Sequence, residues 1–145
     1  MNDLIDKITS KYELQNGWIN TDFINTDSYT DRLFMYSTYY ATYSNVLEIR
    51  TIKGKYIIAM KMKSAREYKH DLSDICGIIN EMNKNNESIT LEEIKQAIIE
   101  LYGSIARIDK DMIDLVERVL SDPTMYEKMV EFENNHRYTI MKEDK

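Results

Sequence analysis

Residues 46–63 read VLEIRTIKGKYIIAMKMK, and this stretch decides the fold because its hydrophobic pattern changes once along its length. The first seven residues, which end at Ile52, are rich in β-branched and apolar side chains and predict a β-strand. Apolar residues occur on both faces of that strand, so we expect both faces to be partly covered. From Gly54 onward the apolar residues follow a helical period, which predicts a strongly buried helix.

The flanking sequence predicts few strands and many helices. Tyr and Thr alternate loosely over residues 32–45, which favours a strand that pairs with residues 46–52 as a hairpin. The chain has only 4 glycines and 1 proline, so few sharp turns are expected. Periodicity and capping residues predict further helices over residues 3–14, 20–25, 70–82, 90–102, 109–120 and 122–133.

The 145 residues are enough for one domain. We predict an α+β, mostly helical fold with a small two- or three-stranded sheet flanked by helices and a C-terminal helical bundle. Residues 1–53 supply a helix and the small sheet, residues 54–135 form the helical part, and residues 136–145 are expected to fray. Two or three strands alone would leave an exposed sheet edge.

Composition excludes several classes of protein. The hydrophobic fraction is 43% and the charged fraction 30%, which is typical of a globular domain rather than a disordered chain. No apolar run approaches the ~18 residues of a membrane span, and the polar, acidic N-terminus does not resemble a signal peptide. We therefore expect a cytoplasmic protein with no membrane partner. The single cysteine, Cys76, excludes an intrachain disulfide and has no zinc-ligand spacing around it.

Charge is distributed unevenly along the chain. The formal net charge is −6, which makes non-specific binding of nucleic acid unfavourable. Residues 48–71 nevertheless contain seven basic and three acidic side chains. This local basic stretch has two interpretations, a solvated helix face or a surface that faces phosphate groups.

Lys61 stands in the middle of an apolar helix, where an ammonium group is costly to bury without a partner. Asp71 and Asp74, at positions i and i+3, share one face of the next helix. Partners for Lys61 are therefore these aspartates, Glu48 or a ligand phosphate. A purely structural interpretation remains open, in which Asp71 caps the helix that follows, Asp74 complements its dipole and Lys61 extends its ammonium to water.

Several of these segments together resemble a known family, the nucleotidyltransferase-like proteins related to the abortive-infection toxins of type IV toxin–antitoxin systems. The similar segments are NGWIN at 16–20, SNVLEIRT at 44–51, YIIAMK at 56–61, Arg66 and DLSDI at 71–75. The resemblance covers roughly residues 4–102. Its most specific part is the succession of Ala-Met-Lys, Arg and Asp-x-x-Asp.

The resemblance implies a DNA polymerase beta-like nucleotidyltransferase fold. It assigns Lys61 and Arg66 to nucleotide phosphates, and it places Asp71 and Asp74 near the active site as catalytic candidates. Glu48 resembles the third active-site carboxylate of the family. Such an enzyme uses Mg²⁺ held by carboxylates, together with cations on the leaving pyrophosphate.

The chain departs from the family in one large respect. The family has a Gly-rich helix start and an Asp-x-Asp pair whose aspartates hold both metals, and the chain has neither. Its one Asp-x-Asp triplet, residues 109–111, follows no glycine motif. We therefore expect a truncated or split C-terminal half that is inactive alone and uses Mg²⁺ only with a complementing half. Its expected ligand is a nucleoside triphosphate, and its expected partner is the missing N-terminal half, a cognate protein or a second copy.

Two alternatives to this interpretation remain. The chain could be a non-catalytic interaction module of a toxin–antitoxin or phage-defence system. It could also be an autonomous enzyme that holds a metal with Glu48, Asp71 and Asp74. The sequence leaves open whether RNA is a partner.

Overall fold

The chain is mostly helical with one small antiparallel sheet, which confirms the predicted α+β fold class. A computed structural model describes residues 2–15, 22–65, 70–122 and 124–143. These ranges contain the α-helices α1 (Asn2–Tyr12), α2 (Arg32–Tyr36), α3 (Gly54–Ser64), α4 (Asp71–Lys84), α5 (Leu91–Tyr102), α6 (Lys110–Ser121) and α7 (Met125–Glu143). They also contain the strands β1 (Ser37–Tyr43) and β2 (Leu47–Ile52) and the 3₁₀ helices η1 (Asp22–Asn25) and η2 (Ile105–Arg107).

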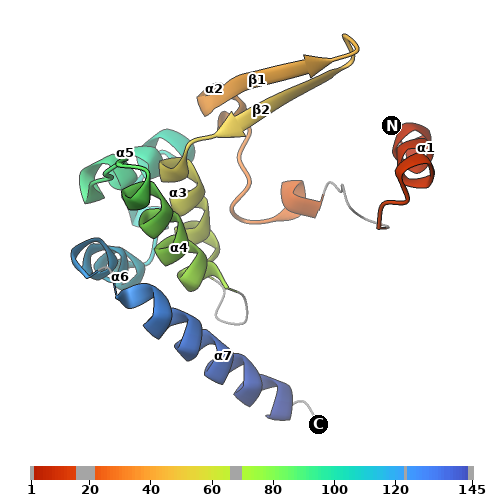
Figure 1. Cartoon of the computed structure of the whole chain (residues 1–145). Coiled ribbons are helices and arrows are strands. Elements are labelled where there is room, and N and C mark those ends of the chain that lie inside the picture. The colour runs from red at the N-terminus through yellow and green to blue at the C-terminus, as the bar shows by residue number, and fades with distance from the viewer. Residues whose placement is uncertain (1, 16–21, 66–69, 123, 144–145) are drawn as a thin grey trace.

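The helices α3 to α7 form the body of the molecule, and the β1–β2 hairpin projects from it (Figure 1). Helix α3 packs against α4 and α5, and α4 packs in turn against α6 and α7. A fully buried aliphatic side chain contributes roughly 1.5–3 kcal/mol to stability. The largest buried apolar side chains come from these helices: Ile58, Met62, Ile75, Ile94, Ile98, Leu101 and Val116. This core fixes α3 against α4, the two helices that supply the predicted site.

Helix α5 follows the sequence signals closely. The Thr90 hydroxyl oxygen accepts a hydrogen bond from the Glu93 backbone N–H (3.2 Å), and the Glu93 carboxylate accepts one from the Thr90 N–H (2.9 Å). This reciprocal capping box is the one that the sequence predicts. The helix ends at Gly103, whose φ of 81° lies in the left-handed region that favours glycine.

The two strands form the predicted hairpin. They pair antiparallel, with Ser37 opposite Ile52 at the base. Ser44 and Asn45 both have positive φ angles, 50° and 54°, and the Val46 N–H donates to the Tyr43 carbonyl oxygen (3.0 Å). Positive φ at two successive residues gives the turn a twist that matches the right-handed twist of the strands.

Residues 32–36 form the short helix α2, where the sequence predicts the first part of a strand. The helix turns Leu33 into the core, where only 6% of its surface is exposed. It also brings the Tyr36 ring against that of Tyr56, with centroids 5.1 Å apart. These contacts with the helical body outweigh the local β-propensity of the sequence, because propensity depends strongly on context.

The hairpin is largely exposed on both faces, whereas the sequence predicts partial cover for both faces of β2. Only alternate residues near the base of β2 are partly buried. We call the exposed apolar side chains of the hairpin the hairpin surface; they are Tyr39, Tyr40, Tyr43, Val46, Leu47 and Ile49. The prediction failed because apolar residues on both faces of a strand show only that burying both faces would be favourable. The described residues supply no second layer that packs on the hairpin.

Helix α7 continues to Glu143, beyond the end near residue 133 that the sequence predicts, and it includes most of the tail that was expected to fray. No glycine or proline occurs after Pro123, so nothing of low helix propensity interrupts the helix. Within the described ranges, no helix combines the length and the apolar character needed to cross a membrane.

Cys76 is buried in α4 with 2% of its surface exposed, and burial raises the pKa of its thiol to about 11. The thiolate is the reactive form, so both effects protect the sulfur. We expect iodoacetamide at pH 8 to modify the folded protein at least about 100-fold more slowly than the urea-unfolded protein. Mass spectrometry of timed samples measures both rates. Similar rates would show that this part of α4 is open to solvent.

Candidate functional site

Lys61 lies in the last turn of α3 and meets the first turn of α4. The Lys61 Nζ donates hydrogen bonds to Asp71 Oδ1 (2.9 Å) and Asp74 Oδ2 (2.6 Å). Charges at helix ends favour this arrangement, because the C-terminal end of a helix attracts cations and the N-terminal end attracts anions. The structure therefore brings three of the five predicted site residues together, and we call Lys61, Asp71 and Asp74 the Lys61 centre.

The three side chains of the Lys61 centre differ in exposure. The Asp71 side chain is 0% exposed, that of Lys61 is 28% exposed and that of Asp74 is 46% exposed. A buried carboxylate is unfavourable without an opposite charge, so the ammonium of Lys61 compensates Asp71 from the solvent side. Asp74 is about half exposed, so water screens its ion pair with Lys61.

The pKa of Lys61 is raised above its ordinary value of 10.5. Burial alone lowers this pKa, but the hydrogen bonds to Asp74 and Asp71 outweigh burial. Lys61 is therefore a cation at neutral pH and cannot serve as a general base there. Because the folded pKa lies above the unfolded one, the stabilising contribution of the ion pairs is complete below about pH 10 and is lost as the pH rises through the folded pKa.

The start of α4 is capped by a residue that the sequence does not point to. Glu133 of α7 is 2% exposed, and its Oε1 accepts hydrogen bonds from the backbone N–H groups of Leu72 (2.9 Å) and Ser73 (3.1 Å). Its Oε2 accepts a hydrogen bond from the Ser73 hydroxyl (2.5 Å) and lies 3.1 Å from His70 Nδ1. The role of helix cap that was considered for Asp71 thus belongs to Glu133, and Asp71 is the first residue of the helix itself.

An open hollow of about 390 Å³ adjoins the Lys61 centre and lies between α4 and α7. Its lining comprises Lys61, Ser73, Asp74, Gly77, Ile78, Glu81 and Tyr126. Tyr126 is 40% exposed and lies over Gly77, where a Cβ would be only 3.4 Å from its ring. This hollow, the Lys61 hollow below, therefore combines an ammonium group with an accessible aromatic ring.

The other two predicted site residues do not join the Lys61 centre in the described structure. Glu48 lies near the tip of the hairpin, opposite Thr42, and its carboxylate accepts a hydrogen bond from Arg50 Nη1 (2.6 Å). The hairpin projects away from the start of α4 (Figure 1). Arg66 lies outside the described residues. The three-carboxylate metal site of the autonomous-enzyme alternative is therefore not assembled, and the described residues contain no group of three side chains that could hold a metal ion.

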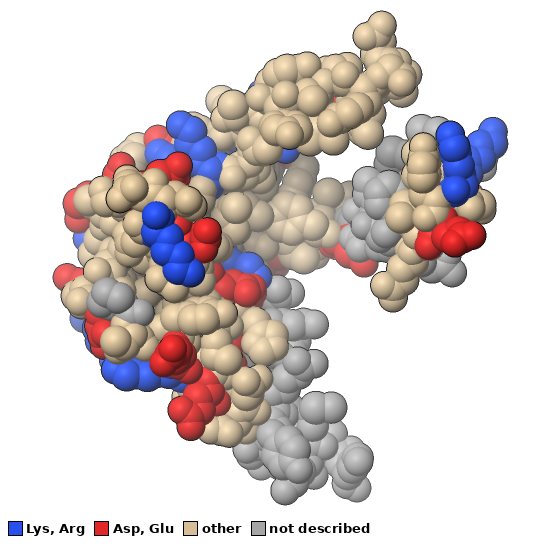
Figure 2. Space-filling model, viewed as in Figure 1, with Lys and Arg blue, Asp and Glu red and all other residues tan. Residues whose placement is uncertain are grey.

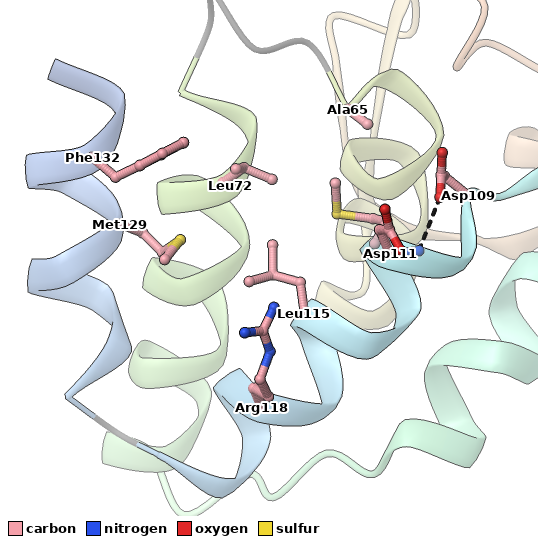
Figure 3. Close-up of a pocket in the computed structure, with 9 residues that line it drawn as sticks. Ala65, Leu72, Asp109, Asp111, Leu115, Arg118, Met129 and Phe132 are labelled. Carbon is pink, nitrogen blue, oxygen red and sulfur yellow. Dashed lines mark hydrogen bonds between the residues drawn. The ribbon is translucent and has the colours of Figure 1, made fainter. Parts of the chain in front are cut away.

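A second hollow, of about 450 Å³, lies among α4, α6 and α7. Figure 3 shows Leu72, Leu115, Met129 and Phe132 on its walls, so its lining is mainly apolar. Asp109 also lines it, but its carboxylate caps α6 by accepting a hydrogen bond from the Asp111 N–H (2.9 Å). Asp111 and Arg118 line it as well, but none of the predicted site residues does.

Comparison with known proteins gave no match, since no family model, no curated protein and no solved structure is significantly similar to the chain. The structure therefore defines the class only as a mostly helical α+β protein with a projecting hairpin and a lysine–aspartate centre. Sequence reasoning missed Tyr126 and Glu133 in the neighbourhood of this centre. Gly77 could have indicated the contact with Tyr126, because a lone glycine inside a helical pattern often has a packing reason.

Proposed function

We propose that the Lys61 hollow is part of a nucleotide-phosphate site in a nucleotidyltransferase-like protein, and that the chain is inactive without a complementing polypeptide. The observation that supports this most is that Lys61 and Tyr126 line the same open hollow. Phosphate oxygens form charge-assisted hydrogen bonds with an ammonium group, and bases stack on aromatic rings. A ligand with an anionic end and an aromatic end fits both groups.

The charge of the centre sets a condition on the ligand. Two carboxylates outnumber one ammonium, and Glu81 adds a further acidic group to the hollow. A free polyphosphate would be repelled, whereas a Mg²⁺-bound triphosphate carries its own positive charge. Asp74, which is half exposed, can then exchange Lys61 for the incoming metal. The chain alone does not offer enough ligands to hold Mg²⁺, so the metal enters with the nucleotide and we assign it no resident site.

The sequence resemblance supports the same proposal, because it assigns Lys61 and Arg66 to nucleotide phosphates. It also suggests a setting in toxin–antitoxin or phage-defence biology. In this proposal Asp71 is a positioning residue that holds Lys61, and the catalytic groups come from the complementing polypeptide.

Calorimetric titration of the chain with ATP, CTP, GTP and UTP, with and without Mg²⁺, tests the nucleotide site. We expect weak binding of at least one nucleotide, with a dissociation constant of about 1 mM or lower, and only when Mg²⁺ is present. Lys61→Met should weaken binding at least about tenfold, equivalent to about 1.4 kcal/mol. Tyr126→Ala should weaken it by about 1–3 kcal/mol if the base stacks on the ring.

Lys95→Ala is the matched control, because Lys95 is also 28% exposed and is also paired with an acidic residue, Glu92 (2.9 Å), but lies on α5. It should bind like the wild type. Thermal melting of every variant separates loss of binding from loss of folding, and Tyr126→Ala keeps the test valid if Lys61→Met unfolds. Absence of binding by folded wild type, or equal binding by wild type and folded Lys61→Met, would refute the proposal.

A second candidate function is that of a non-catalytic interaction module, and the hairpin surface favours it. Exposed apolar groups that gather on one element mark sites of protein association. The same titration discriminates between the candidates, because an interaction module binds no nucleotide and still associates with a protein. Association that persists in Lys61→Met would place the interaction apart from the Lys61 centre.

A further inference from the structure

A polar cleft of about 270 Å³ lies where the C-terminal ends of α3 and α5 meet the segment that leads into α2. Its lining includes three basic side chains, Arg32, Lys63 and Arg107, and one acidic side chain, Asp27. We call it the Lys63 cleft. Lys63 stands two residues after Lys61 on α3, and residues two apart do not share a helix face. The cleft and the Lys61 hollow have no lining residue in common, so they are separate places on the molecule.

The three cations of the Lys63 cleft form no ion pair with any described residue, Asp27 included. Elsewhere in the helical body Lys55, Lys61 and Lys95 each pair with an acidic side chain. On the face shown in Figure 2, blue and red side chains are interspersed over that body. Cations that gather without carboxylate partners leave a positive potential in the cleft, and this potential attracts an anion.

Hydrogen bonds between distant parts of the chain hold the walls of the cleft in place. The Tyr102 hydroxyl donates to the Ser28 carbonyl oxygen (2.8 Å), and Arg32 Nη1 donates to the Glu100 carbonyl oxygen (3.2 Å). These bonds join the segment before α2 to the last turn of α5, 68 to 74 residues later. A guanidinium group has five N–H donors, so Arg32 keeps donors for a ligand. The cleft is therefore preformed, and a ligand need not order its walls.

Two guanidinium groups and one ammonium group suit a phosphate group. Each guanidinium is a planar fork that can bind two phosphate oxygens, and the ammonium adds a compact positive charge. The net charge of −6 opposes a long polyanion such as nucleic acid. The cleft, at about 270 Å³, is also slightly smaller than the ~300–1,000 Å³ of a typical small-molecule site. The ligand that fits best is therefore a small molecule with a phosphate or diphosphate group.

We propose that the Lys63 cleft binds the phosphate group of a small phosphorylated molecule through Arg32, Lys63 and Arg107. The site is distinct from the Lys61 hollow, so the inference does not depend on the proposed function. Asp27 opposes the bound anion, and Arg32 and Arg107 are exposed to water. We therefore expect weak binding of a bare anion, with a dissociation constant of about 1 mM for inorganic pyrophosphate at low salt.

An NMR titration of the full chain with inorganic pyrophosphate, at low salt and with EDTA, tests the proposal. EDTA removes the Mg²⁺ that the Lys61 hollow requires. We expect backbone amide signals of residues 102–107 to shift, while those of Asp74 and Gly77 stay in place. Acetate at the same concentration should cause no such shifts, because a carboxylate has a single charge and only two oxygens.

Substitutions that change one charge each provide the sharper test. Lys63→Met and Arg107→Gln should each weaken pyrophosphate binding at least about fivefold, the factor expected for two unit charges about 4 Å apart in water. Asp27→Asn should tighten it, because it removes the one carboxylate that lines the cleft. Arg118→Gln is the matched control, because Arg118 is also exposed and forms no ion pair with a described residue, but lies on α6. It should bind like the wild type.

Unchanged amide signals at about 20 mM pyrophosphate would overturn the inference, since a millimolar site would be nearly saturated there. Equal weakening by Arg118→Gln and Lys63→Met would also overturn it, because binding would then follow net charge alone. Tighter binding of a short single-stranded RNA than of pyrophosphate, lost in Lys63→Met, would assign the cleft to nucleic acid and overturn the small-molecule assignment. Failure of the nucleotide proposal is a separate result, because Lys61→Met should bind pyrophosphate at the Lys63 cleft like the wild type.

Discussion

Lys61→Met is expected to lower the free energy of unfolding by about 1.5–3 kcal/mol at pH 7, which is the usual contribution of a hydrogen bond between charged groups. Methionine keeps the length and apolar stem of the side chain, so the change is mainly one of charge. It removes the ammonium that donates a hydrogen bond (2.9 Å) to the carboxylate of Asp71, which is 0% exposed. Urea denaturation followed by circular dichroism measures the loss.

The reciprocal variant provides the sharpest control. Asp71→Asn removes the buried charge and leaves Lys61, which is 28% exposed, with Asp74 and with water. We expect it to cost less, about 1–2 kcal/mol. Equal costs for the two variants would show that the charge of Asp71 does not depend on Lys61 for its stabilisation.

The residues of the Lys61 centre could be named from the sequence because the physical reason is local. An ammonium group inside an apolar helix needs a partner, and two aspartates three residues apart share a helix face just beyond it. Helix α5 was predictable for the same reason, since Thr90 and Glu93 cap it through groups only three residues apart. Where the determining contacts lie within one helical turn or join two helices that follow each other in the chain, pattern and structure agree.

The predictions that failed depend on contacts between distant parts of the chain. Helix α2 replaces a strand because Leu33 packs into a core built from residues far along the chain. Glu48 has the residue type of a metal ligand, but the hairpin that contains it projects from the body (Figure 1), a direction that strand periodicity does not encode. Glu133 caps a helix that begins more than sixty residues earlier, so no local motif marks it.

Glu133→Ala should be the second strongly destabilising substitution, with a loss of roughly 2–4 kcal/mol. It removes the side-chain acceptor for the backbone N–H groups of Leu72 and Ser73, whereas the Ser73 hydroxyl can still donate to the His70 carbonyl oxygen (3.2 Å). A lost helix cap costs about 0.5–2 kcal/mol, and each buried donor left unsatisfied adds about 1–3 kcal/mol before the structure relaxes. Chemical denaturation measures the total loss.

The site at which hydrogen exchange accelerates in Glu133→Ala distinguishes capping of α4 from a general contribution of Glu133 to packing. Hydrogen exchange should accelerate first at the amides of Leu72 and Ser73, because these lose their acceptor, while exchange in α5 changes only as much as global stability does. Glu131→Ala is the matched control, since Glu131 is exposed on the same helix and should change stability by less than about 0.5 kcal/mol. Because the first turn of α4 supplies Asp71 and Asp74, loosening it should also weaken nucleotide binding at the Lys61 hollow. Normal exchange at both amides in Glu133→Ala would show that another group caps α4 in solution.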